Sequence, residues 1–295
     1  MAAPLVLRSV LFVPGTRTDR FAKAFASGAD AVVLDLEDGV EAGRKDDARR
    51  EVGEWVASAP SPPCTRLIRV NARGSAWHND DLGWLRTIAG AFDAVVLPKT
   101  ERATDVEAVA TGVRSRRIIP LLETARGILQ AATIATADAD IPAIFFGAED
   151  LTAELGIPRT LAGEELLFAR SKVVLAAATI GADAIDAVFV DLASPERLRE
   201  DAARACALGF RGKMAIHPDQ VSVINSVFTP SAAEIDEARR LIDANDEARA
   251  RGEGVFRFDD RMVDAPVIRR ARQVLARADP SGARASAPPV DADGS

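Results

Sequence analysis

The chain has 295 residues, 48% of them hydrophobic, so it can bury a large core as one α/β barrel or as two ordinary domains. A formal net charge of −7 provides no basic field for nucleic acid or an anionic membrane, so we expect a small-molecule partner. Two cysteines, Cys64 and Cys206, lack the spacing of a zinc site or disulfide framework, and two histidines, His78 and His217, exclude a multi-histidine metal site.

Eight short apolar runs recur along the chain, and each is followed by a helical pattern. Their hydrophobicity is continuous rather than alternating, which is typical of strands buried on both faces of a parallel sheet. Eight strand-helix units predict an α/β protein with a closed (β/α)8 barrel, the TIM-barrel fold. In chain order the predicted strands are residues 9–13, 31–36, 66–70, 94–98, 118–122, 143–146, 184–190 and 213–216.

The helical patterns support this architecture and divide the chain into three parts. One predicted helix carries an apolar face interrupted by Arg170, made of Leu166, Leu167, Val173, Val174 and Ala177. Ser194 before Pro195 predicts a helix start, and Ser231 with Glu234 fits a capping box. We expect a barrel domain over residues 1–228, a C-terminal helical extension over 229–278 and a disordered tail over 279–295.

Polar residues follow the predicted strands, at the end of a (β/α)8 barrel where chemistry takes place. Glu123 and Asp150 end consecutive strands, so the strand spacing would hold their oxygens close enough to share one hard cation such as Mg²⁺. The alternative for Glu123 is that it simply opens the next helix, where a negative charge is favourable. The polar and turn residues at the strand ends are Pro14, Gly15, Asp35, Glu37, Asp38, Arg69, Asn71, Lys99, Glu123, Glu149, Asp150, Asp191 and His217.

Seven motifs in order carry a resemblance to a known family. They are the segment 8–49, "IRVN", "VLPKT", "LLETARG", "GAEDL", "GFRGKMAIHPDQV" and "RMVDAPVIRRAR". Together they resemble the citrate lyase β-subunit family of the HpcH/HpaI aldolase/citrate lyase superfamily, which includes malyl-CoA and citramalyl-CoA lyases. The resemblance covers roughly residues 8–275. It implies a TIM barrel, usually a homotrimer or hexamer, that uses Mg²⁺ (Mn²⁺ as a substitute) to cleave or form a carbon-carbon bond between an acyl-CoA and a 2-oxo acid.

The resemblance also implies roles for particular residues. Glu123 and Asp150 match the family's metal ligands, and Arg69 matches its substrate-orienting, charge-stabilising arginine. A guanidinium can bind a carboxylate or oxyanion in a planar, bidentate way, although Arg69 could also neutralise nearby carboxylates. Asp264 matches the family's catalytic aspartate, often supplied by a neighbouring subunit; on sequence alone it is an ordinary helix cap. In cleavage it would protonate the acyl-CoA enolate, and in synthesis it would act as base.

Further residues receive supporting roles. Glu37 and Asp38 are assigned to the catalytic group, where they would fix Arg69 or metal-bound waters. Arg17, Arg20 and Lys23 are candidates for CoA phosphates, with a solvated helix start as the alternative. His217 is expected to be structural. Backbone amides are expected to bind the oxo acid's carboxylate at Gly147, Ala148, Glu149 and Asp150.

Two alternatives remain open. One is a class II pyruvate aldolase without CoA, whose histidine base near the N-terminal strands is missing here, since no histidine precedes His78. The other is a citrate lyase β subunit that acts on a citryl-acyl carrier protein within a complex. The chain lacks a membrane-spanning apolar run and a signal peptide at its start, so we expect a cytoplasmic protein.

Overall fold

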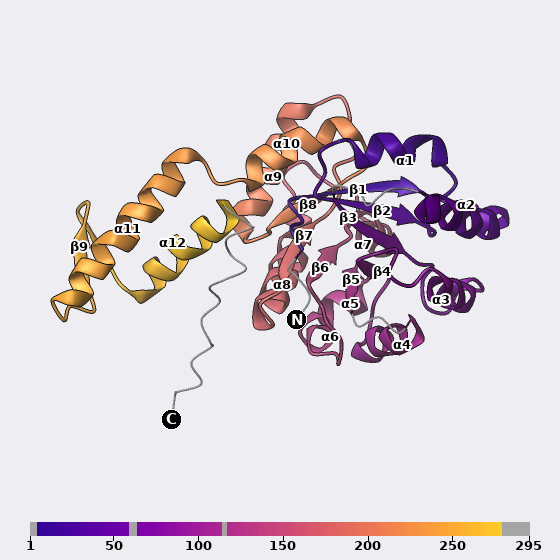
Figure 1. Ribbon diagram of the computed structural model, residues 1–295, viewed down its shortest axis with the longest axis horizontal. Coiled ribbons are helices and arrows are strands. Elements are labelled where there is room, and N and C mark those ends of the chain that lie inside the picture. The colour runs from indigo at the N-terminus through magenta and orange to yellow at the C-terminus, as the bar shows by residue number, and fades with distance from the viewer. Residues whose placement is uncertain (1–4, 59–63, 114–116, 279–295) are drawn as a thin grey trace. The chain divides into compact units, whose positions relative to one another are not determined.

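A computed structural model describes residues 5–58, 64–113 and 117–278 of the chain. The eight strands form the predicted closed barrel: each strand pairs in parallel with its sequence neighbour, and β1 pairs with β8 (Figure 1). The strands are β1 Ser9–Pro14, β2 Ala31–Asp35, β3 Thr65–Arg69, β4 Ala94–Leu97, β5 Ile118–Leu122, β6 Ala143–Phe146, β7 Asp183–Asp186 and β8 Gly212–Ala215.

One strand is shorter than predicted. The apolar run that we expected to be a strand over residues 184–190 leaves the sheet after Asp186. Beyond that point side chains take the backbone carbonyls, since Arg159 donates to Val188 O at 2.7 Å and Gln220 Nε2 donates to Phe189 O at 2.7 Å. Apolar character continued past the strand because Phe189 is buried in the helical layer, which composition alone does not distinguish from a strand.

The helices surround the barrel, as the ribbon shows (Figure 1). Pro195 begins a helix as predicted, but the Ser194 side chain makes no capping hydrogen bond. Leu167 of the expected apolar face is half exposed, whereas Leu166, Val173 and Ala177 are buried, and Arg170 is buried with them. The helices are α1 Thr18–Phe25, α2 Lys45–Ser58, α3 His78–Thr87, α4 Ala103–Val113, α5 Ala125–Leu129, α6 Ala131–Ala135, α7 Ala148–Leu155, α8 Leu167–Thr179, α9 Pro195–Leu208 and α10 Pro218–Phe228, with 3₁₀ turns η1 Ala42–Arg44 and η2 Glu164–Leu166.

The barrel has two hydrophobic layers that follow from the alternation of side chains along each strand. Val33, Leu121 and Phe145 belong to the core inside the barrel. Their neighbours Leu34 and Leu122 belong to the core between the strands and the helices. Both faces of each strand are therefore buried, which explains the continuous hydrophobicity of the strand sequences.

A buried ion network lies in the outer layer beside β7 and β8. Arg170 of α8 makes a two-pronged contact with Asp186, with Nε and Nη2 at 2.9 and 2.7 Å from the carboxylate. The Lys213 ammonium lies 2.6 Å from Asp186 and 2.6 Å from Asp201 of α9. These charged side chains are almost fully buried. Such burial is tolerated because each charge has a partner of opposite sign.

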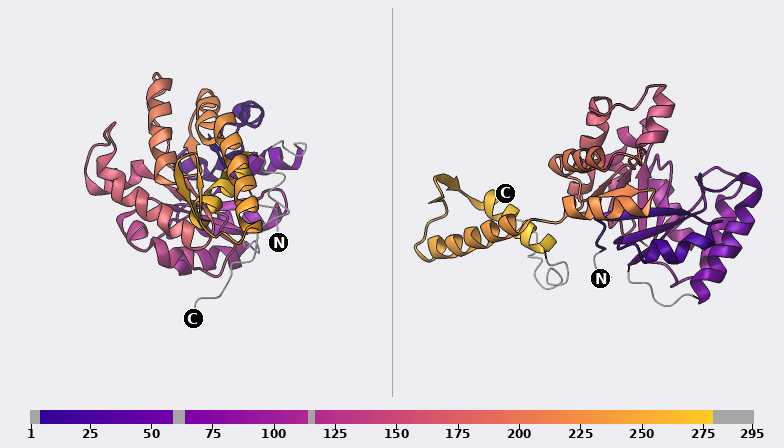
Figure 2. Two further views of the ribbon diagram at one scale, coloured as in Figure 1. Left: turned by 90° about the vertical axis from the view of Figure 1, so that its left-hand side faces the viewer. Right: turned by 90° about the horizontal axis from the view of Figure 1, so that it is seen from above.

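The chain divides between Phe228 and Thr229 into the barrel unit and a C-terminal unit. The C-terminal unit contains α11 Ala232–Ala250, the hairpin β9 Phe256–Phe258 and β10 Arg261–Val263, and α12 Ala265–Ala278 (Figure 2). The predicted capping box at the start of α11 is confirmed: the Ser231 side chain accepts from the Glu234 N–H, and the Glu234 side chain accepts from the Ser231 N–H. The predicted disordered tail, 279–295, lies outside the described residues.

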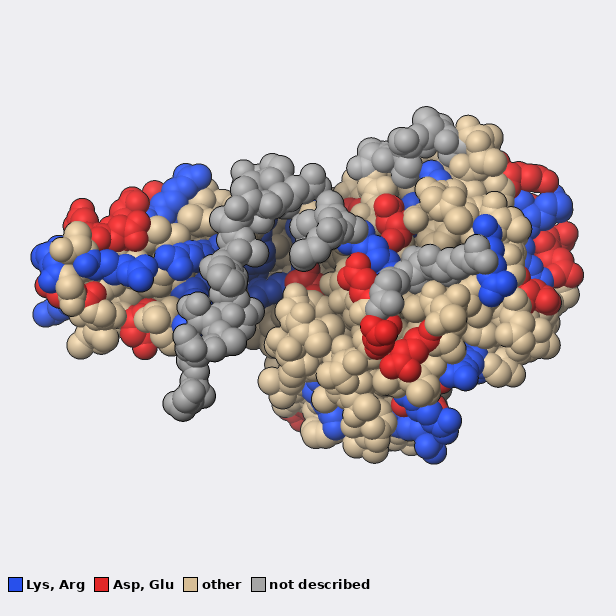
Figure 3. All heavy atoms as spheres, turned by 60° about the horizontal axis from the view of Figure 1, so that its bottom comes forward, with Lys and Arg blue, Asp and Glu red and all other residues tan. Residues whose placement is uncertain are grey.

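Acidic and basic side chains form separate small groups among uncharged residues on the face of the barrel unit drawn in Figure 3. None of the helices in the described ranges combines the length and apolarity needed to cross a membrane.

Candidate active site

The candidate site is built from inward-facing positions at the C-terminal ends of the strands. Val33 and Leu121 face the barrel interior, so Asp35 and Glu123, two positions further along, point to the same side. Arg69 is the register partner of Asp35 in the β2–β3 pair. The alternation that fills the core with apolar side chains therefore ends in charged ones at the mouth of the barrel.

Arg69 is bound by two carboxylates. Its Nε and Nη2 atoms lie 2.7 and 2.8 Å from the two oxygens of Asp35, and its Nη1 lies 2.8 Å from Glu37 Oε2. Burial disfavours the charged form of each group, but the attraction between the two charges is larger than this effect. Asp35 therefore raises the pKa of Arg69, and Arg69 lowers the pKa of Asp35. The alternative interpretation, an arginine that neutralises nearby carboxylates, is thus observed, and the role of Arg69 toward a substrate stays a prediction.

Glu123 is a buried carboxylate, and no lysine or arginine side chain within residues 5–58, 64–113 and 117–278 makes direct contact with it. It is 2% exposed, and its Oε1 accepts the backbone N–H of Lys99 at 2.9 Å. Gly147 leaves it room, since a Cβ at that position would lie 2.6 Å from Glu123 Oε2. Burial, followed by repulsion from Glu37 and Asp150, raises the pKa of Glu123 to about 8. The ionised form of Glu123 is therefore disfavoured in the absence of a counter-charge, and a bound cation would stabilise it.

Lys99 lies among the other carboxylates. Its Nζ is 2.6 Å from Glu37 Oε1, 3.5 Å from Asp38 Oδ2 and 3.6 Å from Asp150 Oδ1. Burial lowers the pKa of Lys99, but the hydrogen bond and charge of Glu37 outweigh it and raise the pKa. At Glu37 burial dominates instead, and the pKa of its carboxyl is raised despite Arg69 and Lys99. Sequence reasoning placed Lys99 at a strand end without giving it a role; its position directly after a buried strand in "VLPKT" is the signal that was present.

The balance of charge in this group fits a divalent cation. We call the group the acidic cluster; its carboxylates and cations are Asp35, Glu37, Asp38, Glu123, Asp150, Arg69, Lys99 and Lys45, whose Nζ binds the Leu36 and Glu37 carbonyls at 2.8 and 2.7 Å. With all of them ionised, five carboxylates face three cations. The excess of two negative charges and the oxygen donors of Glu123 and Asp150 suit Mg²⁺, which keeps several waters and takes one or two protein carboxylates. No set of three or more His, Cys, Asp or Glu side chains within the described ranges could hold one metal ion.

Four backbone amides were expected to bind the oxo acid's carboxylate at the start of α7. The N–H of Gly147 donates to Leu122 O at 3.0 Å, so it is already used in joining β6 to β5. The amides of Ala148, Glu149 and Asp150 lie in the first helical turn, where N–H groups have no acceptor within the helix. The Asp150 side chain is 37% exposed and so open to a ligand.

The Glu149 side chain, next to Asp150 in the sequence, forms an ion pair within the protein. It pairs with Arg159, which also donates to Val188 O at 2.7 Å and lies 3.8 Å from Asp201. Arg159 therefore connects the start of α7 with the buried network of the outer layer. Sequence reasoning missed Arg159 because it lies between helices without a local pattern.

The candidates for CoA phosphates lie on α1. Arg17, the residue before α1, is paired with Asp19, with its Nε and Nη2 each 2.9 Å from the carboxylate. Arg20 and Lys23 are exposed and follow at helical spacings of three residues. These three positions form one side of the helix start, and their role toward CoA stays a prediction.

Asp264 lies in the C-terminal unit as an exposed residue just before α12. Its Oδ1 accepts the Val267 N–H at 3.3 Å, the contact of an ordinary helix cap. His217 Nδ1 accepts the Asp219 N–H at 3.3 Å, which agrees with a structural role in the turn after β8. Asp191 instead accepts the Ala193 N–H at 3.0 Å in its own loop.

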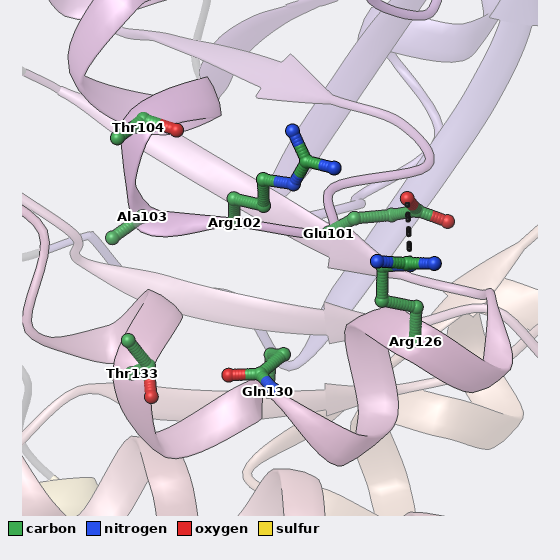
Figure 4. A pocket seen from close by; sticks show the side chains of 7 residues that line it. All are labelled: Glu101, Arg102, Ala103, Thr104, Arg126, Gln130 and Thr133. Carbon is green, nitrogen blue, oxygen red and sulfur yellow. Dashed lines mark ion pairs between the residues drawn. The ribbon is translucent and has the colours of Figure 1, made fainter.

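A hollow lies near the barrel rim, between the β4–α4 loop and helices α5 and α6 (Figure 4). It has a volume of about 320 Å³. Arg126 lies opposite Glu101, with the guanidinium Nε 3.5 Å from the carboxylate. The lining residues are Glu101, Arg102, Ala103, Thr104, Arg126, Gln130 and Thr133. None of these side chains belongs to the acidic cluster.

Comparisons with known proteins show the family to which the chain is similar. Residues 8–218 match the family described as HpcH/HpaI aldolase/citrate lyase. A citrate lyase subunit beta-like protein of Deinococcus radiodurans is 40% identical over 93% of this chain and 98% of its own length. A (3S)-malyl-CoA thioesterase of Cereibacter sphaeroides is 38% identical over 92% and 94%. The crystal structure of CitE from Mycobacterium tuberculosis in complex with magnesium, acetoacetate and coenzyme A is 39% identical and superimposes with a TM-score of 0.79 over 94% of this chain and 98% of that one.

Proposed function

The chain belongs to the HpcH/HpaI aldolase/citrate lyase family, and on that premise we propose that it is a Mg²⁺-dependent carbon-carbon lyase acting on CoA esters. The substrate class proposed is a 3-hydroxyacyl-CoA such as malyl-CoA or citramalyl-CoA, which is cleaved to, or formed from, an acyl-CoA and a 2-oxo acid. The observation that carries the proposal is the acidic cluster at the mouth of the barrel, where Glu123 is buried and, among the residues that the structure describes, no lysine or arginine side chain makes direct contact with its carboxylate. The magnesium and coenzyme A in the M. tuberculosis complex support it.

Glu123 and Asp150 are the proposed metal ligands, with Mn²⁺ as a substitute for Mg²⁺. When bound, the ion supplies Lewis-acid polarisation of the substrate oxygen next to the bond that breaks. The amides of Ala148, Glu149 and Asp150 are proposed to bind the carboxylate of the oxo acid, since the start of a helix favours an anion. This arrangement fixes the oxo-acid half of the substrate beside the strand ends.

Arg69 is proposed to act on the thioester half. When the carbon-carbon bond breaks, the substrate hydroxyl loses its proton to solvent and becomes the carbonyl of the oxo acid. The electron pair of the broken bond moves into the thioester and gives an enolate, whose oxyanion a guanidinium can stabilise. The Nη1 atom is the part of the Arg69 guanidinium that can turn to the substrate. Its partner Glu37 also binds Lys99, so Glu37 keeps one cationic partner when Arg69 moves away. Asp38, near both cations, is proposed to assist in holding them.

Asp264 is proposed to give a proton to the enolate carbon in cleavage and to remove one in synthesis, from its own or a neighbouring subunit. Its exposed carboxylate has only a weak capping contact to lose. CoA phosphates are assigned to Arg17, Arg20 and Lys23, where exposure of the last two supports the proposal.

A second candidate function is hydrolysis of the thioester. It is favoured by the 38% identical malyl-CoA thioesterase, which covers most of this chain. A third, action on a citryl-acyl carrier protein as one subunit of citrate lyase, is favoured by the names of other relatives. The pyruvate aldolase alternative has no comparable support among these relatives.

One experiment distinguishes these candidates. The purified chain alone is incubated with malyl-CoA, citramalyl-CoA or 3-hydroxy-3-methylglutaryl-CoA, with Mg²⁺ or with EDTA, and the CoA products are separated by chromatography. A lyase gives a shortened acyl-CoA and an oxo acid but no free thiol, and EDTA stops it. A thioesterase gives free CoA and the intact hydroxy acid. Inactivity on all three esters, combined with cleavage of a citryl-acyl carrier protein, would reject the CoA-ester lyase.

We also propose that the protein is a cytoplasmic homotrimer or hexamer. Large apolar side chains are exposed on and around α7 and α8, among them Leu155, Leu161, Phe168 and Leu175, and association would remove them from water. Cys64 and Cys206 are free, as expected in a reducing compartment. Sedimentation velocity of the wild type and of a Phe168→Ser/Leu175→Ser variant tests the association: the variant should yield smaller species.

A further inference from the structure

Lys99 has a backbone conformation that a lysine rarely adopts. Its φ is 48°, in the left-handed region that disfavours residues with a Cβ. Lys99 lies two residues after the end of β4, and this conformation allows two contacts at once. The backbone N–H donates to Glu123 Oε1 at 2.9 Å, while the side chain reaches Glu37 Oε1 at 2.6 Å. Lys99 thus contacts Glu123 through its backbone and Glu37 through its side chain.

The ammonium of Lys99 is shared rather than committed to one partner. An ammonium has three donors and no acceptor, and Nζ lies 2.6 Å from Glu37, 3.5 Å from Asp38 and 3.6 Å from Asp150. The contact with Asp150 is the longest of the three. The Lys99 side chain is 34% exposed, so it has space to shift without unpacking the barrel.

A metal ion at the proposed site would meet this ammonium. Mg²⁺ binds carboxylate oxygens at about 2.0–2.1 Å, so an ion on Asp150 Oδ1 would lie within roughly 6 Å of Nζ in its observed place. Two cations at that separation repel each other strongly at the partly buried mouth of a barrel. Glu37 and Asp38 offer the ammonium a place that does not involve Asp150.

We propose that Lys99 is a built-in counter-cation of the metal site: it holds Glu37, Asp38 and Asp150 together when the metal is absent, and it leaves Asp150 for Glu37 when Mg²⁺ binds. The inference rests on the proposed metal site at Glu123 and Asp150. Its consequence is that the protein keeps its carboxylates in place without metal, at the expense of metal affinity. An anionic substrate, which adds negative charge at the site, would then favour Mg²⁺ binding. Lys99 is a positioning residue in this scheme.

The test replaces the charge and measures Mg²⁺ binding by isothermal titration calorimetry in the absence of substrate. Lys99→Met keeps the length of the side chain and is subject to the same backbone constraint. We expect its dissociation constant for Mg²⁺ to fall about tenfold or more, because the repulsion is removed. Thermal unfolding gives a second measure: the metal-free variant should melt below the metal-free wild type, and Mg²⁺ should raise its melting temperature by more.

Three further variants make the result specific. Lys99→Arg keeps the charge and should bind Mg²⁺ nearly as the wild type does. Lys99→Asn lacks the charge but suits the left-handed backbone, so it replaces Lys99→Met if that protein folds poorly, with the same expectation. Arg126→Met removes a positive charge at the rim, where Arg126 faces Glu101, and should leave the dissociation constant unchanged.

Two outcomes would overturn the inference, and they are distinguishable. If the wild type and Arg126→Met bind Mg²⁺ but neither charge-free variant at Lys99 binds it more tightly, the counter-cation role is wrong and the metal site stands. If the wild type shows no saturable Mg²⁺ binding, the proposed metal site fails, and the role of Lys99 fails with it.

Discussion

The substitution Glu123→Gln separates two effects of the buried carboxyl: its effect on the stability of the metal-free protein and its proposed role in binding Mg²⁺. Burial and the neighbouring Glu37 and Asp150 raise the pKa of Glu123 from 4.5 to about 8 in the metal-free protein. A raised pKa in the folded state means that this residue's contribution to stability is complete below pH 4.5 and is lost as the pH rises towards about 8. At about 1.4 kcal/mol per pH unit, the loss amounts to about 3 kcal/mol near pH 7. A glutamine has the same shape, can accept the Lys99 N–H and has no proton to release on unfolding, so the metal-free variant should be the more stable protein at neutral pH, by at most that amount.

Mg²⁺ should stabilise the wild type more than it stabilises the Glu123→Gln variant. A ligand present at about a hundredfold excess over its dissociation constant stabilises the folded state by about 2.7 kcal/mol. The wild type should gain this stabilisation, and its Mg²⁺ affinity should increase as the pH approaches 8, because the metal replaces a proton on Glu123. The Gln variant should gain little and should have no lyase turnover.

Urea unfolding, followed by circular dichroism between pH 5 and pH 8 with EDTA or with Mg²⁺, measures both effects. Glu54→Gln is the matched control, since Glu54 is exposed on α2 and pairs with the exposed Arg50 at 3.4 Å; it should follow the wild type. The reasoning is refuted if metal-free Glu123→Gln shows the same loss of stability with rising pH as the wild type, or if the variant keeps the full stabilisation by Mg²⁺.

Four other variants test the remaining roles. Asp150→Asn should abolish Mg²⁺ binding in calorimetry while leaving the melting temperature of the metal-free protein within a few degrees, because the side chain is partly exposed; normal binding would remove it from the ligand set. Arg69→Lys cannot keep the two-pronged contact with Asp35, so kcat should fall about 100-fold or more and the melting temperature should decrease, with Mg²⁺ affinity largely kept; an unchanged kcat contradicts the oxyanion role. Asp264→Asn keeps a capping side chain, so stability should be unchanged while turnover and solvent-proton exchange into the acyl-CoA, measured by NMR, are lost; continued exchange would exclude Asp264 as the proton carrier. Arg17→Glu with Arg20→Glu should raise the KM for the CoA ester with little change in kcat, and an unaltered KM would place the CoA phosphates elsewhere.

Local rules were sufficient for much of the fold. Strands buried on both faces must be continuously apolar, and parallel neighbours need a helix between them, so the eight runs predicted both the strands and their order. The capping box of α11 lies within four residues and was equally readable. The same order of strands placed Glu123 and the start of α7 at adjacent strand ends, which is why the amino-acid sequence was enough to name two candidate ligands.

The structure decided what depends on residues far apart in the chain. Arg69 could have faced a substrate or a carboxylate, and its contact with Asp35 spans 34 positions. In the sequence Lys99 was a strand-end residue without a role, yet in the structure it contacts Glu37, 62 positions away. Its backbone is left-handed, and nothing about a lysine predicts that conformation from the sequence. The early end of β7 depends in the same way on Arg159, 29 positions from the carbonyl it takes. The sequence by itself thus determined the barrel and the presence of carboxylates at its mouth, because alternation and strand order are local and repeated. Which cation neutralises which carboxylate was decided only by the tertiary structure, because charge pairing acts through space and leaves no periodic pattern in the chain.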